Sequence, residues 1–193
     1  ESINRPQNVS EIPYELAYRK AKEIAKDYYN DIVIGSDTIV AINNEVLEKP
    51  IDEKDAYRML KLLNNNTHEV ISGIAILYQD KEIRYIEKSF VTFNNLTDKE
   101  ILDYIATKDP LDKAGAYGIQ NEYINLVKEF SGEYENIVGL PLIRLEKELK
   151  NGNLNSIYLL YGEETFLLES ILKKIKINFG ELVKGINYIQ IDE

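Results

Sequence analysis

The stretch VIGSDTIVAINNEVLEKP, residues 33–50, begins like a buried β-strand and then places the polar triplet Ser36, Asp37 and Thr38 in its middle. Side chains alternate between the two faces of a strand, and both faces here are largely apolar, which is typical of a strand covered on two sides. A carboxylate buried there costs several kcal/mol unless it is paired or bound to a cation, so Asp37 needs a partner. Two interpretations are open: hydrogen bonds from a helix N-terminus, or a chemical site.

The end of the same segment favours a chemical site. Glu48, Lys49 and Pro50 close a hairpin-like segment that returns a lysine toward the end of the strand. An acid that binds Mg²⁺ or activates water, beside lysines that bind phosphate oxygens, suits the hydrolysis of a phosphoanhydride.

The composition narrows the classes of function. The chain has 193 residues, of which 44% are hydrophobic and 29% charged, enough for one full domain and part of a second. It has no cysteine and one histidine, which excludes disulfides and thiolate zinc sites and leaves hard cations on carboxylates as the expected metals. The net charge of -10 disfavours non-specific nucleic-acid binding, although a few local lysines suffice for a small phosphorylated substrate.

Two further expectations concern the cellular location of the protein and the start of the chain. No run approaches the ~20 apolar residues of a membrane span, and the first residues lack the blocks of a signal peptide, so we expect a cytoplasmic protein. The chain begins with Glu1 and no initiator Met, so we expect that a segment is missing in front of it.

A helix is predicted over residues 12–29, and it brings a lysine close to the polar strand. Its apolar stripe has the spacing of one helical face. The stripe consists of Ile12, Leu16, Ile24 and Tyr28, with Lys20 on the same line. Two interpretations of Lys20 are open: its stem covers apolar surface while the ammonium reaches water, or the cation points into a pocket.

The remaining elements alternate helices and strands. Asp52 caps a helix over 52–63, and Thr97 with Glu100 has the spacing of a capping box. Two strands flank a turn at 79–82, and a loop at 110–120 carries glycines that let backbone approach a ligand closely. A strand, a turn and a helix follow up to residue 150. The pattern predicts an α/β fold with a mixed twisted sheet and flanking helices.

A break in composition at NGNLN, residues 151–155, predicts a linker between a domain over 1–150 and a separate piece over 156–193. The second piece has the pattern strand, helix, strand. Such a βαβ fragment is too short to be stable alone, so we expect it to add little to the first domain. The alternative is that its first strand, SIYLLYG, docks on an open sheet edge.

Five motifs together resemble one known family. IGSDTIV, LEKP, HEVISG, DKAGAYGIQ and GEYENIVGLPL are similar, in this order, to the motifs of the Maf family of nucleoside triphosphate pyrophosphatases. The resemblance covers residues 1–150 and implies a fold like that of inosine triphosphate pyrophosphatases, with two lobes around a cleft. It also implies hydrolysis of a nucleoside triphosphate to the monophosphate and pyrophosphate, supported by Mg²⁺ or another divalent cation such as Mn²⁺.

The resemblance assigns roles to single residues. Asp37 corresponds to the catalytic base or metal ligand, Lys49 and Lys20 to active-site lysines, and Glu1 to an acid that helps hold the metal. Thr38 and Gln120 correspond to the positions that separate the dTTP and UTP branch from the branch acting on 7-methyl-GTP. Ser36, Asp112 and Lys113 are further candidates for substrate contacts.

Family members begin with a strand and a loop of the form SxSPRR that binds the triphosphate, and this chain starts after it. We therefore expect about three phosphate contacts to be missing and activity to be impaired. Residues 156–193 resemble the start of the delta subunit of the bacterial DNA polymerase III clamp loader, and YGEETF lacks the phosphate-loop pattern.

Two classes of function follow. The first is an enzyme that hydrolyses dTTP, UTP or modified pyrimidine triphosphates, with a homodimer as an option. The second is a non-catalytic binding module, or a piece of replication machinery of the kind that residues 156–193 resemble. His68 stands at the start of a predicted strand. We interpret it as a hydrogen-bonded structural residue and not as a candidate for the functional site.

Overall fold

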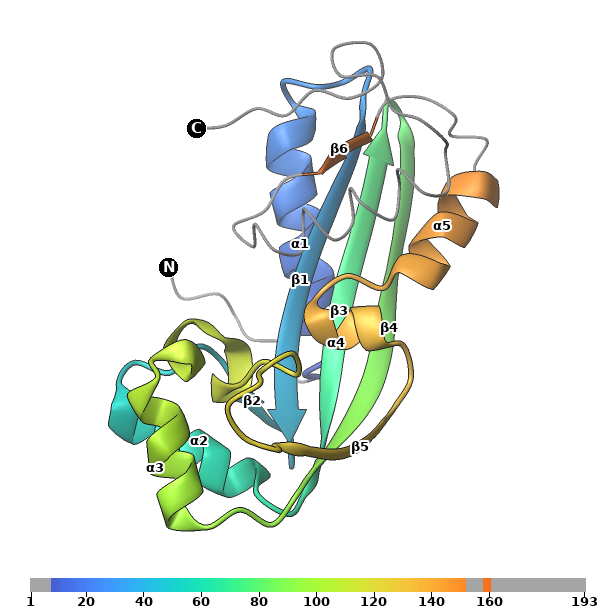
Figure 1. The fold of residues 1–193 in the computed structure, drawn as a ribbon. Coiled ribbons are helices and arrows are strands. Elements are labelled where there is room, and N and C mark those ends of the chain that lie inside the picture. The colour runs from blue at the N-terminus through green and yellow to red at the C-terminus, as the bar shows by residue number, and fades with distance from the viewer. Residues whose placement is uncertain (1–7, 152–157, 161–193) are drawn as a thin grey trace.

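A sheet of long antiparallel strands forms the centre of the computed structural model, which describes residues 8–151 and 158–160 (Figure 1). The strands follow the order β2-β1-β3-β4-β5, and β6 pairs with β1 outside this path. The elements are α1 (Glu11–Ala25), β1 (Ile32–Ile42), β2 (Glu45–Leu47), α2 (Glu53–Leu63), β3 (Thr67–Tyr78), β4 (Lys81–Phe93), α3 (Asp98–Ala106), η1 (Asp109–Asp112), η2 (Ala114–Ala116), β5 (Val127–Ser131), α4 (Tyr134–Val138), α5 (Leu142–Asn151) and β6 (Tyr158–Leu160). The predicted α/β class is confirmed, although β1 to β5 are all antiparallel and only β6 makes the sheet mixed.

The outer edge of β1 is open in its middle. One edge pairs with β3 along almost the whole strand. On the other edge, β6 pairs in parallel with residues 32–34 and β2 pairs antiparallel with residues 40–42. Within the described ranges, no strand pairs with this edge between residues 35 and 39, so backbone groups that point away from β3 are left for another partner.

Helix α1 covers one face of the sheet at very short range. A Cβ on Gly73 would lie 2.2 Å from the carbonyl oxygen of Pro13, and a Cβ on Gly35 would lie 2.3 Å from that of Ala17. Only glycine on the strands and small residues on the helix permit this approach. The buried stripe of α1 is therefore Pro13, Ala17 and Ala21, and the predicted stripe of larger apolar residues was wrong by one position.

The opposite face of the sheet carries a polar row between two hydrophobic clusters. The lower cluster, at the bottom of Figure 1, joins β1, β3 and β4 to α2 and α3, and the strands contribute Val40, Val70 and Val91 to it. The upper cluster joins the same strands to α5, with Ile34, Ile74 and Tyr85 in its sheet layer. Between them, the same face carries Ser36, Thr38, Ser72 and Ser89. The expected pair of lobes around a cleft stays a prediction.

The predicted helix starts and the hairpin are confirmed. The side chain of Asp52 accepts a hydrogen bond from the Asp55 amide, and Thr97 and Glu100 form a complete capping box. Strands β3 and β4 form the predicted hairpin. The region predicted as a strand, a turn and a helix contains one more short helix, α4, which ends at Gly139 with φ 118°.

The strand predicted near the start of the tail is present as β6. It pairs with β1, which agrees with the alternative that this strand docks on an open edge of the sheet. The rest of the predicted tail, like most of the linker, lies outside the described residues, so both domain boundaries stay predictions.

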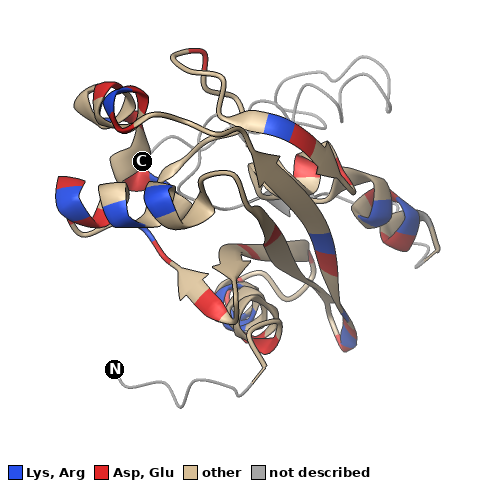
Figure 2. Ribbon diagram, turned by 90° about the horizontal axis from the view of Figure 1, so that it is seen from below, with Lys and Arg blue, Asp and Glu red and all other residues tan. Residues whose placement is uncertain are grey.

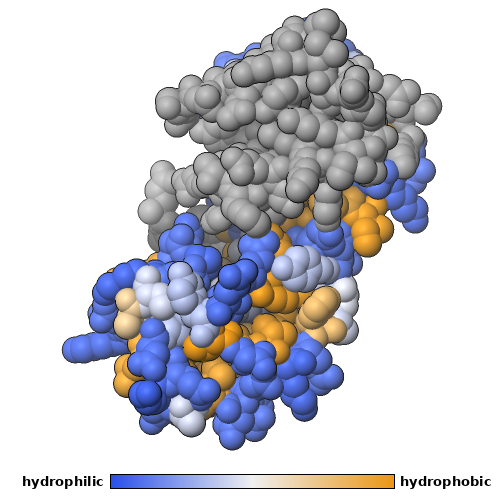
Figure 3. Space-filling view, viewed as in Figure 1, coloured by the Kyte–Doolittle hydropathy of each residue, from blue (hydrophilic) through white to orange (hydrophobic). Residues whose placement is uncertain are grey.

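Charged side chains of both signs are mixed on the helices, whereas the middle of the sheet is largely uncharged (Figure 2). Hydrophobic side chains show between hydrophilic ones over the middle and lower part of the face seen in Figure 3. Within residues 8–151 and 158–160, no helix combines the length and the apolar character needed to cross a membrane.

Candidate active site

The largely buried carboxylate of Asp37, in the polar triplet, is paired with a lysine of α1. The Nζ atom of Lys20 lies 2.8 Å from Oδ1 of Asp37, and the two side chains are 61% and 15% exposed. Burial raises the pKa of the Asp37 carboxyl, and the hydrogen bond and positive charge of Lys20 offset part of that rise. The partner of Asp37 is thus the Lys20 ammonium group, and the catalytic role of this lysine stays a prediction.

The position of this pair follows from the two strands and the helix. Asp37 pairs with Gly73 and faces α1, and Lys20 flanks the small stripe on which α1 rests. Asp37 also lies within the open part of the β1 edge. A ligand that reaches this edge would meet a carboxylate, an exposed ammonium group and backbone groups that no described strand pairs with.

Lys49 follows β2 on the same edge. The last pair of the β1–β2 ladder joins Val40 to Leu47, and Lys49 comes two residues after it. The backbone before Lys49 is anchored, because the Gly115 amide donates to the Glu48 carbonyl at 3.2 Å. The segment that carries Lys49 and the DKAGAYG loop, which are far apart in the sequence, therefore meet beside the end of β1.

The neighbours of Asp37 in the triplet point to the other face of the sheet. The Ser36 hydroxyl donates to the carbonyl of Gly139 at 2.9 Å, and the Thr38 hydroxyl lies 3.2 Å from the same oxygen. Thr38 also shares a hydrogen bond of 2.7 Å with Ser72. The structure thus uses both hydroxyls to hold the end of α4, which the sequence did not indicate.

The loop residues that were predicted to contact substrate form a local network. Lys113 pairs with Asp109 at 3.0 Å and with Asp112 at 2.7 Å. The Gly118 amide donates to the hydroxyl of Tyr104 at 3.4 Å, and Gln120 is exposed just beyond it. These bonds fix the course of the loop, and the direct roles of Asp112, Lys113 and Gln120 stay predictions.

His68 has the structural role that the sequence indicates. It is 2% exposed, and its Nε2 atom shares a hydrogen bond of 2.8 Å with the Tyr117 hydroxyl. Its ring also contacts Phe93 and Tyr117 edge to face. Burial lowers the pKa of His68 to about 4, so the ring is neutral in the folded protein at neutral pH.

Any metal at this site would depend on few protein ligands. Among the described residues, no group of three or more carboxylate or imidazole side chains is close enough to hold a metal ion. Glu1, the second predicted ligand, lies outside the described residues. Asp37 supplies a hard oxygen ligand, and Mg²⁺ is often held by one or two carboxylates together with the phosphates of the substrate. The residues present fit that mode of binding.

Sequence reasoning missed Ser72, Ser89 and Asn136, which connect the polar row to α4. A usable signal was present, since the serines at 72 and 89 lie next to the apolar positions Val70, Ile74 and Val91 on the same face of their strands. Asn136 lies inside the quoted motif GEYENIVGLPL, where the resemblance assigned no role to it.

Replacing Lys20 with Met is expected to raise the pKa of Asp37, because the variant keeps the burial of the carboxyl and loses the neighbouring cation. The pKa is measured by following the ¹³Cγ resonance of Asp37 through a pH titration. Lys22→Met is the control, since Lys22 lies over the ring of Tyr18. An unchanged Asp37 pKa in Lys20→Met would contradict the pairing.

Comparison with known proteins places these observations in context. A family profile described as Maf-like protein matches residues 1–152. A dTTP/UTP pyrophosphatase of Bacillus mycoides (strain KBAB4) is 44% identical over 150 residues, which are 78% of this chain and 78% of the relative. A dTTP/UTP pyrophosphatase of Geobacillus sp. (strain WCH70) is 45% identical over 150 residues, 78% of this chain and 81% of the relative.

Proposed function

The chain belongs to the Maf family, and we propose that it hydrolyses dTTP and UTP to the nucleoside monophosphate and pyrophosphate at the site around Asp37. The observation that carries the proposal is the pair of Asp37 and Lys20 at the open edge of β1. The names of the relatives favour this enzyme over a non-catalytic module or a replication fragment.

The proposed role of each residue follows from the charge of its side chain. The Asp37 carboxylate is the proposed base that takes a proton from the attacking water, or the ligand of a divalent cation. Lys20 and Lys49 are the proposed partners of phosphate oxygens, where positive charge stabilises the negative charge that builds up during cleavage. Mg²⁺, when bound through Asp37 and the triphosphate, would neutralise further phosphate charge.

Three finer statements belong to the same proposal. Thr38 and Gln120 are proposed to select the pyrimidine base. A SxSPRR segment in front of residue 1 is proposed to complete the phosphate contacts, and Glu1 to support the metal. A cytoplasmic location and a homodimer are expected but do not bear on the chemistry.

The proposal is tested by comparing kcat/KM for dTTP, UTP, ATP and GTP, with pyrophosphate release as the signal. We expect dTTP and UTP to be preferred by at least about 100-fold, because a site that hydrogen-bonds one base leaves polar groups unpaired with another. The assay uses the full chain and the same chain preceded by a SxSPRR strand and loop. Comparable turnover of all four nucleotides, or no turnover by either form, would overturn the proposal.

A further inference from the structure

A row of buried hydrogen bonds crosses the face of the sheet opposite α1 and ends at the two hydroxyls that flank Asp37. Its centre is Asn136 of α4, which is fully buried. The Asn136 side-chain amide donates to the carbonyl of Val70 at 3.2 Å and to the Ser89 hydroxyl at 3.0 Å. One short helix is thereby attached to both β3 and β4 through a single side chain.

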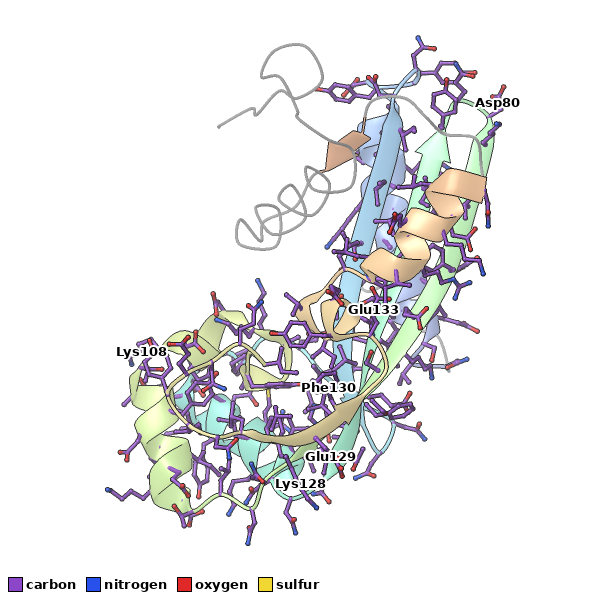
Figure 4. All side chains as sticks on the ribbon, turned by 45° about the vertical axis from the view of Figure 1, so that its right-hand side comes forward. Asp80, Lys108, Lys128, Glu129, Phe130 and Glu133 are labelled. Carbon is purple, nitrogen blue, oxygen red and sulfur yellow. The ribbon has the colours of Figure 1, made fainter. Side chains whose placement is uncertain are left out.

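The same segment is held at its start and at its end. The Ser89 hydroxyl donates to the carbonyl of Glu133, which Figure 4 shows beside the middle of the sheet, at 3.0 Å. The side chain of Glu133 in turn accepts a hydrogen bond of 2.7 Å from the Ile143 amide, at the start of α5. The position of α4 is therefore fixed against the strands and against the following helix.

The end of α4 carries the acceptor that Ser36 and Thr38 use. The Gly139 amide donates to the carbonyl of Asn136 at 3.0 Å, and Ser72 reaches that carbonyl at 3.4 Å. The Gly139 carbonyl then accepts from Ser36 and Thr38. A change at Asn136 would move the Gly139 carbonyl, which is the acceptor that the Ser36 and Thr38 hydroxyls share.

We propose that Asn136 is a positioning residue that fixes the Thr38 side chain through the carbonyl of Gly139 and so supports discrimination between bases. The second half of this statement rests on the proposed function, and the first half does not. The Asn136 side-chain amide holds α4 against β3 and β4 through the two hydrogen bonds that it donates, while its Oδ1 atom has no hydrogen-bond partner among the described residues. Loss of the two donated bonds would leave α4 free to adopt several arrangements. Thr38 should therefore occupy one rotamer when Asn136 is present and several when it is not.

The first test does not require activity. Scalar couplings that report χ1 of Thr38 are measured in the full chain and in Asn136→Leu, which loses both donated hydrogen bonds. We expect a single rotamer in the parent chain and averaged couplings in the variant. Ser72→Ala, which removes a contact of Thr38 directly, is the second variant in case Asn136→Leu does not fold. Asn94→Leu is the control, because its side chain bonds to Asn125 instead. Unchanged Thr38 couplings in the folded variants would overturn the proposal.

The second test separates positioning from a general structural role. In Asn136→Leu we expect the ratio of kcat/KM for dTTP to that for ATP to fall at least about 10-fold, through a raised KM for dTTP. In a Thr38→Val background the same substitution should change the ratio no further, since both act through one side chain. An equal loss for all nucleotides, or additive effects of the two substitutions, would overturn the role in specificity. Absence of hydrolysis in the parent chain would refute the proposed function instead and leave the coupling measurement to decide the positioning.

Discussion

Asp37→Asn is expected to lower kcat/KM for dTTP by about 100-fold or more, since loss of a general base or of a metal ligand typically has an effect of this size. The two side chains have nearly the same shape, so the packing under α1 should be retained. The substitution also removes a buried charge whose pKa is raised mainly by desolvation. We therefore expect the thermal midpoint of Asp37→Asn to equal or exceed that of the parent chain.

The comparison of activity and stability makes this prediction specific to chemistry. A variant that loses activity while it keeps its thermal midpoint has lost function at the site, not its fold. Asp80→Asn is the matched control, because Asp80 lies at the tip of the β3–β4 hairpin, at the far end of the sheet (Figure 4). Retention of more than about a tenth of the activity by Asp37→Asn would show that its assigned role is wrong.

His68 is expected to make the folded chain less stable as the pH falls from about 6.5 toward 4. The pKa of His68 is lowered to about 4 in the folded protein by burial, and it returns to about 6.5 on unfolding. Between these two values the unfolded chain binds a proton that the folded chain does not, so unfolding becomes more favourable as the pH falls. A difference of this size corresponds to about 3 kcal/mol of the free energy of unfolding at the acid end.

The effect of His68 is isolated by comparing urea denaturation of the parent chain and of His68→Gln at several pH values. Carboxylates also titrate in this range; the pKa values of Asp98 and Glu100, for example, are lowered by their hydrogen bonds. These groups are common to both chains. The contribution of His68 is therefore the difference between the two chains in how steeply the free energy of unfolding changes with pH. We expect His68→Gln to be less stable near pH 7 and to lose less stability on acidification. Equal pH slopes would contradict a neutral, buried His68.

Local patterns predicted most of the elements correctly, because they depend on residues close together in the chain. The caps at Asp52 and Thr97 and the apolar character of both faces of β1 are of this kind. The buried face of α1 could not be predicted in the same way. It is selected by Gly35 and Gly73, two glycines on neighbouring strands that admit the helix backbone and leave room only for small side chains.

At the site, too, some features follow from local sequence and others depend on how distant parts of the chain pack. The need of Asp37 for a partner follows from its place in an apolar strand, but the identity of the partner depends on how α1 lies across the sheet. Lys20 was therefore open between two interpretations on periodicity alone. The polar row through Ser72, Ser89 and Asn136 joins three parts of the chain, and neither spacing nor composition relates them to one another.

The proposed reaction is the hydrolysis of dTTP to dTMP and pyrophosphate, with Asp37 as the proposed chemical centre of the site. The most direct measurement is ³¹P NMR of the products formed from dTTP with Mg²⁺, by the parent and Asp37→Asn chains, each with and without the added SxSPRR segment. We expect equal amounts of dTMP and pyrophosphate from the parent sequence in its active form, and almost none from Asp37→Asn. Release of orthophosphate with dTDP, or equal rates for the parent and Asp37→Asn chains, would contradict the proposal.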